Sequence, residues 1–451
     1  MTHAPSTVAP STSPQLTAVR GEIVHFLADP THDARALEHF ADGVLIVRAG
    51  HVAECGPAPE LLAKLPAGTP LADYRGKLIL PGFVDTHVHY PQTDIIASHG
   101  EQLLEWLEKY TFPAERRFAD PAHAAEVADF FCTELLRNGT TTAAAFATVH
   151  AASVDALFKA AHARRMRLIT GKVLMDRNCP DFLCDTAAAG DAESKALIER
   201  WHGRDRLLYA VTPRFAPTST PAQMQLAGRL FAEHPGVYLQ SHLAENRGEV
   251  DWAAQLYPEA RSYLDVYARF GQLGMRALFA HCLWLDDADR RRMAETGSAM
   301  SFCPTSNLFL GSGLFDLQRA RELGVRVGLG TDVGAGTSFS MLQTLNEAYK
   351  VLQLQGQQLS AESAFHLATL GGAHSLYLDD RIGNFAPGKE ADFVVLDPRA
   401  TPLLARRSAA CTTLAERLFV LMMLGDDRAV AATHVLGEAA CLRPPNPAVQ
   451  G

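Results

Sequence analysis

Four histidines and one aspartate that could bind a divalent metal ion each lie in or just after a short apolar run of the sequence. Imidazole and carboxylate groups are ligands that zinc uses in proteins, and a catalytic zinc site keeps one position open for water. A bound metal lowers the pKa of that water, so the set predicts a hydrolase with one divalent metal. The residues are His87 and His89 in VDTHVH, His242 in QSHLAE, His281 in LFAHC and Asp332 in GLGTDVGAG.

The spacing within the set has a physical reason. Side chains alternate along a strand, so His87 and His89 face the same side while Val88 packs around the barrel. Each residue alone has a structural alternative: His281 could be a core histidine and Asp332 a helix N-cap. Found together at successive strand ends, the five favour a metal site.

An acidic residue accompanies this set. Glu245 follows His242 by three positions, close enough to act as an acid or base over the same metal. An HxxE pair on a helix turn is by itself more often a solvated ion pair. Its place beside a candidate ligand favours the catalytic interpretation.

The elements that must position these residues alternate between strands and helices. Such alternation predicts an α/β protein with a parallel sheet, and eight strands predict a closed (β/α)8 TIM-like barrel with its chemistry at the C-terminal strand ends. Asp120–Pro121 and Thr220–Pro221 are typical helix starts, and Asn138–Gly139 and Gly297 typical helix ends. The expected strands are 82–90, 141–146, 167–175, 207–214, 236–244, 276–282, 298–304 and 326–332, with helical patterns at 120–139, 153–165, 220–236 and 287–297.

The two ends of the chain differ from its middle. Residues 1–17 are rich in Pro, Ser and Thr, which predicts a disordered tail. Residues 18–79 and 380–451 have β-rich patterns with glycine turns and no helical crossovers, and we expect them to form one small β-sandwich domain. The barrel is expected over residues 80–379.

Composition excludes several classes of protein. The 451 residues carry a formal net charge of −9 without a basic block, which argues against a nucleic-acid partner. No apolar run has the roughly 18 residues that a membrane span needs. Eight cysteines occur without a CxxC pair, and Cys282 and Cys303 lie in strand-like runs. We therefore expect reduced thiols and a cytoplasmic protein.

Six segments together resemble the guanine deaminase family within the amidohydrolase superfamily. The resemblance extends over roughly residues 40–400, and the PQTD, TPRF and SHxxEN segments are its most specific parts. The six are PGFVDTHVHYPQTD, MDRNCPD, TPRFAPTST, SHLAENRGEV, SFCPTSNLFLGSG and GTDVGAGTSFSM.

The resemblance implies a zinc-dependent aminohydrolase, acting on the C–N bond of a cyclic amidine, that converts guanine to xanthine and ammonia in purine catabolism. It also implies a homodimer. One zinc per chain would be bound by His87, His89, His242 and Asp332. Glu245, His281 and Asp332 would act in the reaction, and the purine would contact Gln92, Trp106, Arg214, Phe215, His242, Glu245 and Asp332.

Whether a member of this superfamily binds one or two metal ions is indicated by the presence of a bridging lysine. Binuclear members of the superfamily use a bridging carboxylated lysine at the end of a middle strand. The fourth strand here ends in VTPRF, and Lys172 lies within the third strand rather than at its end. The sequence therefore favours a mononuclear site.

The expected mechanism assigns a role to each group. Water activated at zinc attacks C2, Glu245 protonates N3, Asp332 accepts a proton and His281 stabilises the developing charge on oxygen. Arg214 and Gln92 would read the O6/N1 edge, which would disfavour adenine.

Alternatives remain open. Arg214 could instead pair with a carboxylate at the barrel rim. The substrate could be another ring, such as an oxidised guanine or a triazine. The chain could also be a non-enzymatic scaffold, although that alternative predicts missing ligands.

Overall fold

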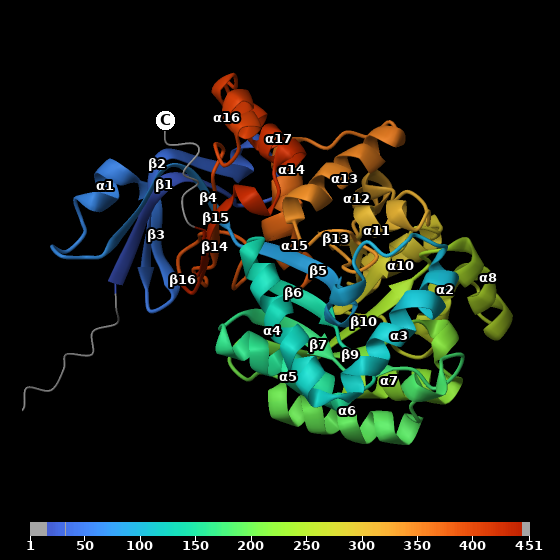
Figure 1. Ribbon diagram of the computed structural model, residues 1–451. Helices are drawn as coiled ribbons and strands as arrows, with labels where there is room; N and C mark the ends of the chain where they lie inside the picture. The colour runs from blue at the N-terminus through green and yellow to red at the C-terminus, as the bar shows by residue number, and fades with distance from the viewer. Residues whose placement is uncertain (1–15, 32, 444–451) are drawn as a thin grey trace, which may run out of the picture.

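A computed structural model describes residues 16–31 and 33–443 of the chain. It contains two separate sheets, one forming a barrel and one formed from both ends of the chain (Figure 1). Most of the expected N-terminal tail lies outside the described residues, and strand β1 already begins at Leu16. No helix among the described residues is long and apolar enough to cross a membrane.

The barrel strands confirm the eight expected strand positions. Neighbouring strands pair in parallel in chain order, and short β8 pairs with β9 beyond the end of β7. Every residue of β5 and β6 is buried, as expected for strands covered on both faces. The strands are β5 (Phe83–His89), β6 (Thr140–Phe146), β7 (Arg167–Gly171), β8 (Val173–Leu174), β9 (Leu207–Pro213), β10 (Tyr238–Leu243), β11 (Ala277–His281), β12 (Ala299–Phe302) and β13 (Arg326–Leu329).

Hydrogen bonds connect the first barrel strand with the segment that follows the last. The backbone N–H of His89 donates to the Val333 carbonyl at 2.7 Å, and the N–H of Asp332 donates to the His87 carbonyl at 2.8 Å. Three candidate ligands from the two extremes of the barrel are thereby held side by side.

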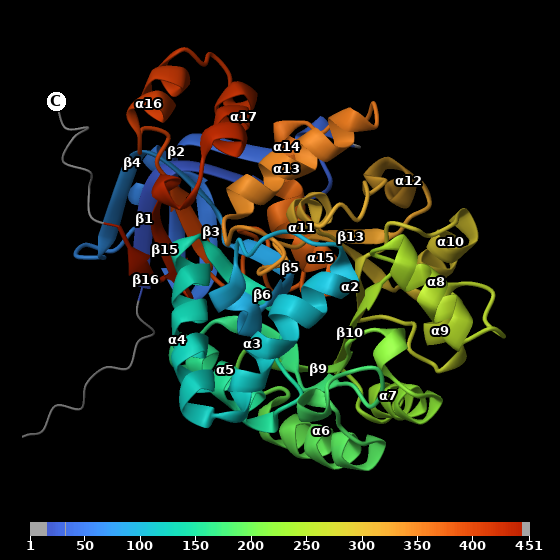
Figure 2. The same cartoon turned by 45° about the vertical axis from the view of Figure 1, so that its right-hand side comes forward.

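Helices surround the barrel (Figure 2), and their ends follow the expected signals. Asp120 and Thr220 cap α4 and α7 through their side chains, and Gly297 ends α10 at a φ of +79°. The larger helices around the barrel are α4 (Pro121–Arg137), α5 (Ala151–Ala163), α6 (Ala187–Trp201), α7 (Pro221–Glu233), α8 (Arg247–Leu256), α9 (Tyr263–Arg269), α10 (Asp287–Thr296), α11 (Pro304–Phe309), α12 (Leu317–Glu322), α13 (Met341–Leu354) and α14 (Ala361–His366).

A broken helical segment lies between β5 and α4, beside the C-terminal ends of the strands. It contains α2 (Leu103–Trp106), the π-helical turn Leu107–Thr111 and α3 (Phe112–Arg116). Its buried side chains Trp106 and Phe112 pack in one cluster with Phe215, which follows β9. The segment therefore covers one side of the expected active site.

The strands of both chain ends join in one seven-stranded sheet in the order β16-β15-β14-β4-β1-β2-β3. The central pairing joins β4 to β14, so segments far apart in sequence share a buried cluster that includes Ile79 and Val395. The strands are β1 (Leu16–Phe26), β2 (Leu37–Arg48), β3 (His51–Pro57), β4 (Leu71–Pro81), β14 (Phe393–Leu396), β15 (Val430–Val435) and β16 (Glu438–Leu442).

The expectation of no helices between the terminal strands is wrong. Helices α16 (Pro402–Ala409) and α17 (Leu414–Leu424) lie between β14 and β15. Thr413 and Glu416 form a capping box at the start of α17, and Leu418 and Leu421 are buried. This signal was present in the sequence beside the more conspicuous strand patterns.

Candidate active site

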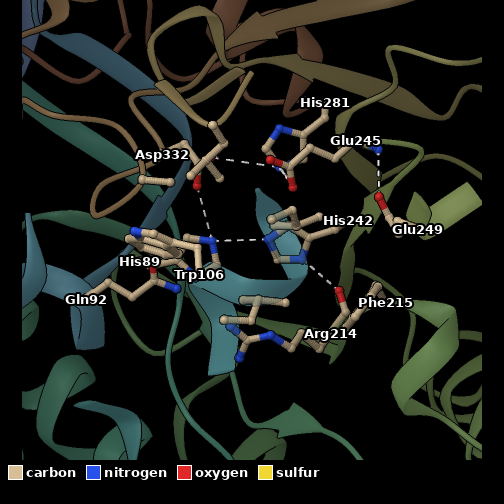
Figure 3. Close-up of a pocket in the computed structure, with 14 residues that line it drawn as sticks. His89, Gln92, Trp106, Arg214, Phe215, His242, Glu245, Glu249, His281 and Asp332 are labelled. Carbon is tan, nitrogen blue, oxygen red and sulfur yellow. Dashed lines mark hydrogen bonds and ion pairs between the residues drawn. The ribbon is translucent and has the colours of Figure 1, made fainter. Parts of the chain in front are cut away.

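A cavity at the C-terminal ends of the barrel strands brings the expected site residues together (Figure 3). His87 lies beside the cavity, with its Nε2 3.2 Å from that of His89. The lining residues are His89, Gln92, Leu103, Trp106, Leu107, Arg214, Phe215, His242, Glu245, Glu249, His281, Leu310, Asp332 and Ala335.

Four separations among the candidate donor atoms suit neighbouring ligands of one zinc ion. His89 Nε2 lies 3.2 Å from the Nε2 atoms of both His87 and His242. Asp332 Oδ1 lies 3.2 Å from His87 Nε2 and 3.3 Å from His89 Nε2. Zinc–ligand distances of about 2.0–2.1 Å place adjacent ligand atoms about 3.3 Å apart, and these four separations match that value.

The surroundings present the imidazoles in the form that binds metal. His242 Nδ1 donates to the Arg214 carbonyl at 2.7 Å, which leaves the lone pair of neutral His242 on Nε2, facing His89. Burial lowers the pKa of His89 to about 4, and burial together with the neighbouring histidines holds that of His242 well below its usual value. Neutral imidazoles are therefore available at neutral pH.

Asp332 is held as an anion by its neighbours. Burial would raise the pKa of this carboxyl, but His87, His89 and His281 together hold it well below its usual range. Asp332 has a φ of +52° and His281 a φ of +71°, a backbone region that non-glycine residues rarely adopt. Such strain at two strand ends is typical of a functional site.

Glu245 faces the same space from the end of β10. Its side chain is buried, with Oε2 3.4 Å from His281 Nε2, and Ser312 donates to Oε1 at 3.3 Å. Burial and the nearby carboxylates of Asp332 and Glu249 raise its pKa well above the usual value. Glu245 is therefore suited to hold a proton at neutral pH.

Two residues that the sequence interpretation did not single out position this acid and its neighbour. Glu249 accepts from the backbone N–H of Glu245 at 2.8 Å. Asn307 Nδ2 lies 2.9 Å from His281 Nδ1. An amide N–H that donates to this atom leaves the imidazole proton on Nε2, directed toward Glu245 and Asp332.

Arg214 lines the cavity and also pairs with a carboxylate. Its Nη1 lies 2.9 Å from both oxygens of Glu115, and both side chains are almost completely buried. The ion pair considered as an alternative role for Arg214 is therefore present, but it uses only one edge of the guanidinium. Arg214 also lines the cavity.

The aromatic side chains form an apolar wall. Phe215 and Trp106 belong to one buried cluster beside the cavity, and both line it. Gln92 follows β5, and its Oε1 accepts from the Gly334 N–H at 3.3 Å. The structure therefore brings every residue expected for substrate binding to one cavity.

Lys172 lies apart from these groups. Its ammonium pairs with Asp185 and, at 3.3 Å, with Glu193. Cys303, expected as a structural thiol, has its Sγ near His87 and Asp332. Burial raises the pKa of this thiol well above its usual value.

Glu115 and Asn307 could not be assigned from spacing. Glu115 lies in FPAER, which has the pattern of an ordinary amphipathic helix, and its partner Arg214 is 99 residues away. Asn307 lies within the CPTSN segment that contributed to the resemblance, but nothing in that segment indicates the histidine it meets. Glu249 had a local signal, because Asn246 and Glu249 have capping-box spacing.

A model of the amidohydrolase family matches residues 78–439. The guanine deaminase of Escherichia coli (strain K12) is 56% identical over 425 residues, which cover 94% of this chain and 97% of the relative. A solved structure of E. coli guanine deaminase superposes with a TM-score of 0.93 at 55% identity, covering 95% of this chain and 100% of that one.

Two further solved structures are informative. A guanine deaminase from C. acetobutylicum with guanine bound in its active site has a TM-score of 0.85 at 28% identity, covering 94% of this chain and all of that one. An adenosine deaminase from Xanthomonas campestris with bound zinc has a TM-score of 0.81 at 22% identity, covering 95% and 94% of the two chains. The second likeness concerns the fold alone.

Proposed function

This chain belongs to the amidohydrolase family, and we propose that it catalyses the hydrolytic deamination of guanine to xanthine and ammonia. The observation that carries the proposal is the 56% identity to E. coli guanine deaminase over almost the whole of both chains. The cavity supports it, because the residues expected for metal binding, proton transfer and base binding surround one space.

A single zinc ion is the proposed cofactor. His87, His89, His242 and Asp332 would hold it, because four separations among their donor atoms, of 3.2–3.3 Å, suit neighbouring ligands of one ion. When bound, zinc supplies Lewis acidity that lowers the pKa of water toward 7. Lys172 is committed to two carboxylates, which supports one metal rather than two.

Glu245 is the proposed general acid. C2 of guanine accepts an attacking oxygen poorly unless an adjacent ring nitrogen takes up a proton. The raised pKa of buried Glu245 keeps a proton available for N3. After donating it, the carboxylate can accept the proton that Asp332 took from the water and deliver it to the amino group, which leaves as ammonia. The proton remaining on the new oxygen then restores the acid as the C2 carbonyl forms.

Asp332 and His281 act on the attacking oxygen. Asp332, held as an anion, accepts a proton from the attacking water. His281 directs its Nε2–H toward the same space and stabilises negative charge that develops on oxygen. Asn307 keeps His281 in this tautomer through the contact at Nδ1.

The rest of the cavity orients the ring. Phe215 and Trp106 offer aromatic surface to a planar base. Arg214 and Gln92 lie on another side from Glu245 and His281 in Figure 3, so they can meet the edge of the ring away from the reacting carbon.

The test is incubation of purified protein with guanine while xanthine and ammonia are followed. We expect one ammonia per xanthine and far lower activity on adenine. A panel with an oxidised guanine and a triazine decides between guanine and another ring. Absence of xanthine from zinc-loaded protein would reject the proposal.

A homodimer and a cytoplasmic location complete the proposal, on the basis of family resemblance. Light scattering of the purified protein tests the first, and fractionation of cells that express the chain tests the second.

A further inference from the structure

Glu115 is a fully buried carboxylate that contacts both residues expected to read the base. Each of its oxygens lies 2.9 Å from Arg214 Nη1, and it accepts a hydrogen bond from the Gln92 side chain. We propose that Glu115 is a positioning residue that sets substrate specificity by fixing which hydrogen-bonding groups of Arg214 and Gln92 meet the purine. This inference rests on the proposed function and deepens it.

Helix α3 holds the Arg214 guanidinium in two ways. Glu115 binds its Nη1 edge, and the ring of Phe112, one turn earlier, lies 5.5 Å from the guanidinium carbon. Among the described residues, neither Nε nor Nη2 of Arg214 has a hydrogen-bond partner, and Arg214 lines the cavity. Because a guanidinium only donates, these remaining N–H groups can meet acceptors of the substrate.

The same carboxylate orients Gln92. An amide has an oxygen end and a nitrogen end, and two contacts select one orientation. Gln92 Oε1 accepts from the Gly334 N–H at 3.3 Å, and the amide nitrogen donates to Glu115. The nitrogen therefore lies on the side of Arg214, and the carbonyl is turned toward the backbone.

The resulting edge of the cavity is rich in N–H donors. Guanine offers two adjacent acceptors, O6 and N7, whereas its N1 carries a hydrogen that would need an acceptor. We therefore infer that Arg214 and Gln92 read the O6/N7 edge in place of the O6/N1 edge expected from the sequence. In a purine with an amino group at C6, the N–H donors of that group would face the N–H donors of Arg214 and Gln92.

Substitution of Glu115 by Gln removes the charge and preserves the shape. A neutral amide holds Nη1 weakly and can itself donate, so Gln92 is free to turn its carbonyl toward the substrate. Discrimination between a 6-oxo and a 6-amino purine should then fall, although the zinc ligands are untouched.

The experiment compares guanine with 2,6-diaminopurine, which has the same reacting 2-amino group. We expect Glu115→Gln to lower the ratio of the two kcat/KM values by at least about 10-fold, mainly through a higher KM for guanine. Glu115→Asp, which keeps the charge, should give an intermediate ratio. Exposed Glu108 on the same helical segment provides the control, and Glu108→Gln should leave the ratio unchanged.

A double-mutant cycle separates positioning from general support of the fold. With Arg214→Met already present, Glu115→Gln should lower guanine kcat/KM by clearly less than it does in the wild type, because only its effect through Gln92 remains. An unchanged substrate ratio in Glu115→Gln, or fully additive losses in the cycle, would overturn the inference. If Glu115→Gln does not fold, the ratio for Glu115→Asp decides. Failure of the wild type to deaminate guanine would instead reject the proposed function.

Discussion

The Nε2 atoms of His89 and His242 lie 3.2 Å apart, although 153 residues separate the two histidines in the chain. Their rings are stacked at 5.1 Å with an interplanar angle of 21°. Because His242 Nδ1 donates to the Arg214 carbonyl, its Nε2 carries a lone pair that faces the other ring. A cation shared by the two rings would stabilise this arrangement.

Purified protein should contain close to one zinc per chain, and His87→Ala should lose most of it. His87 would contribute one of four donors, and Lys172 is paired with two carboxylates away from the site. Elemental analysis of dialysed protein measures both quantities. Two tightly held metals per chain would contradict the mononuclear site.

Glu245→Gln should retain zinc and lose activity on guanine. The amide keeps the size of the side chain and a hydrogen-bonding group but cannot cycle a proton, so we expect a loss of roughly 10²–10⁴-fold in kcat. Steady-state kinetics on zinc-loaded protein checks this. Near-normal turnover would assign the proton transfer to another residue.

Arg214→Met should weaken guanine turnover by at least roughly 1.5–3 kcal/mol of transition-state stabilisation, since it removes charge-assisted donors. Zinc content should not change. If the Arg214→Met variant keeps the kcat/KM of the wild type on guanine, Arg214 serves only as the partner of Glu115.

The same substitution should also destabilise the fold. It leaves the buried Glu115 carboxylate without its cation, which costs about 3–5 kcal/mol. Arg214→Met/Glu115→Gln should recover part of this loss, because no unpaired charge remains. Urea unfolding of both variants measures the difference, and equal stability of the two would show that the carboxylate is not the cause.

Stability should decrease as the pH falls from about 6.5 toward 4. Burial lowers the pKa of His434 to about 4, so in this interval the unfolded chain binds a proton that the folded chain does not. The contribution of His434 to the free energy of unfolding is fully present above the pKa of histidine in the unfolded chain and is lost as the pH decreases. The loss amounts to about 1 kcal/mol at about pH 5.5.

A matched variant isolates that contribution. Neutral His434 accepts from the Tyr74 hydroxyl at 2.9 Å and stacks on Phe393. His434→Gln removes the titrating group and keeps a polar partner for Tyr74. Thermal unfolding between pH 7 and 5 should show a shallower dependence in this variant; identical slopes would assign the acid sensitivity to other groups.

The barrel and the grouping of the candidate metal donors were predictable because both depend on local patterns. Each of His87, His242 and His281 ends or nearly ends a buried strand, and the rule that places barrel chemistry at those ends brings them together. The helix caps at Asp120 and Thr220 were equally local. Residues related by the strand period or by a capping motif lie within one short segment. Their relationship can therefore be predicted without knowing which distant segments come into contact.

The remaining features depend on contacts between distant segments. Nothing near Glu115 indicates that Arg214 will meet it, and nothing near Asn307 indicates His281. Helix α17 was missed for another reason: its capping box at Thr413 was readable, but the neighbouring strand patterns suggested an all-β segment.

The pairing of β4 with β14 has a consequence for synthesis of the protein. Strand β4 leads into the first barrel strand, yet its partner is translated only after the whole barrel. Until then one edge of β4, including Leu78 and Leu80, lacks its neighbour, and unpaired apolar edges promote association between nascent chains. Ribosome-bound chains that end before residue 393 should therefore depend on chaperones, whereas chains that extend past β15 should not.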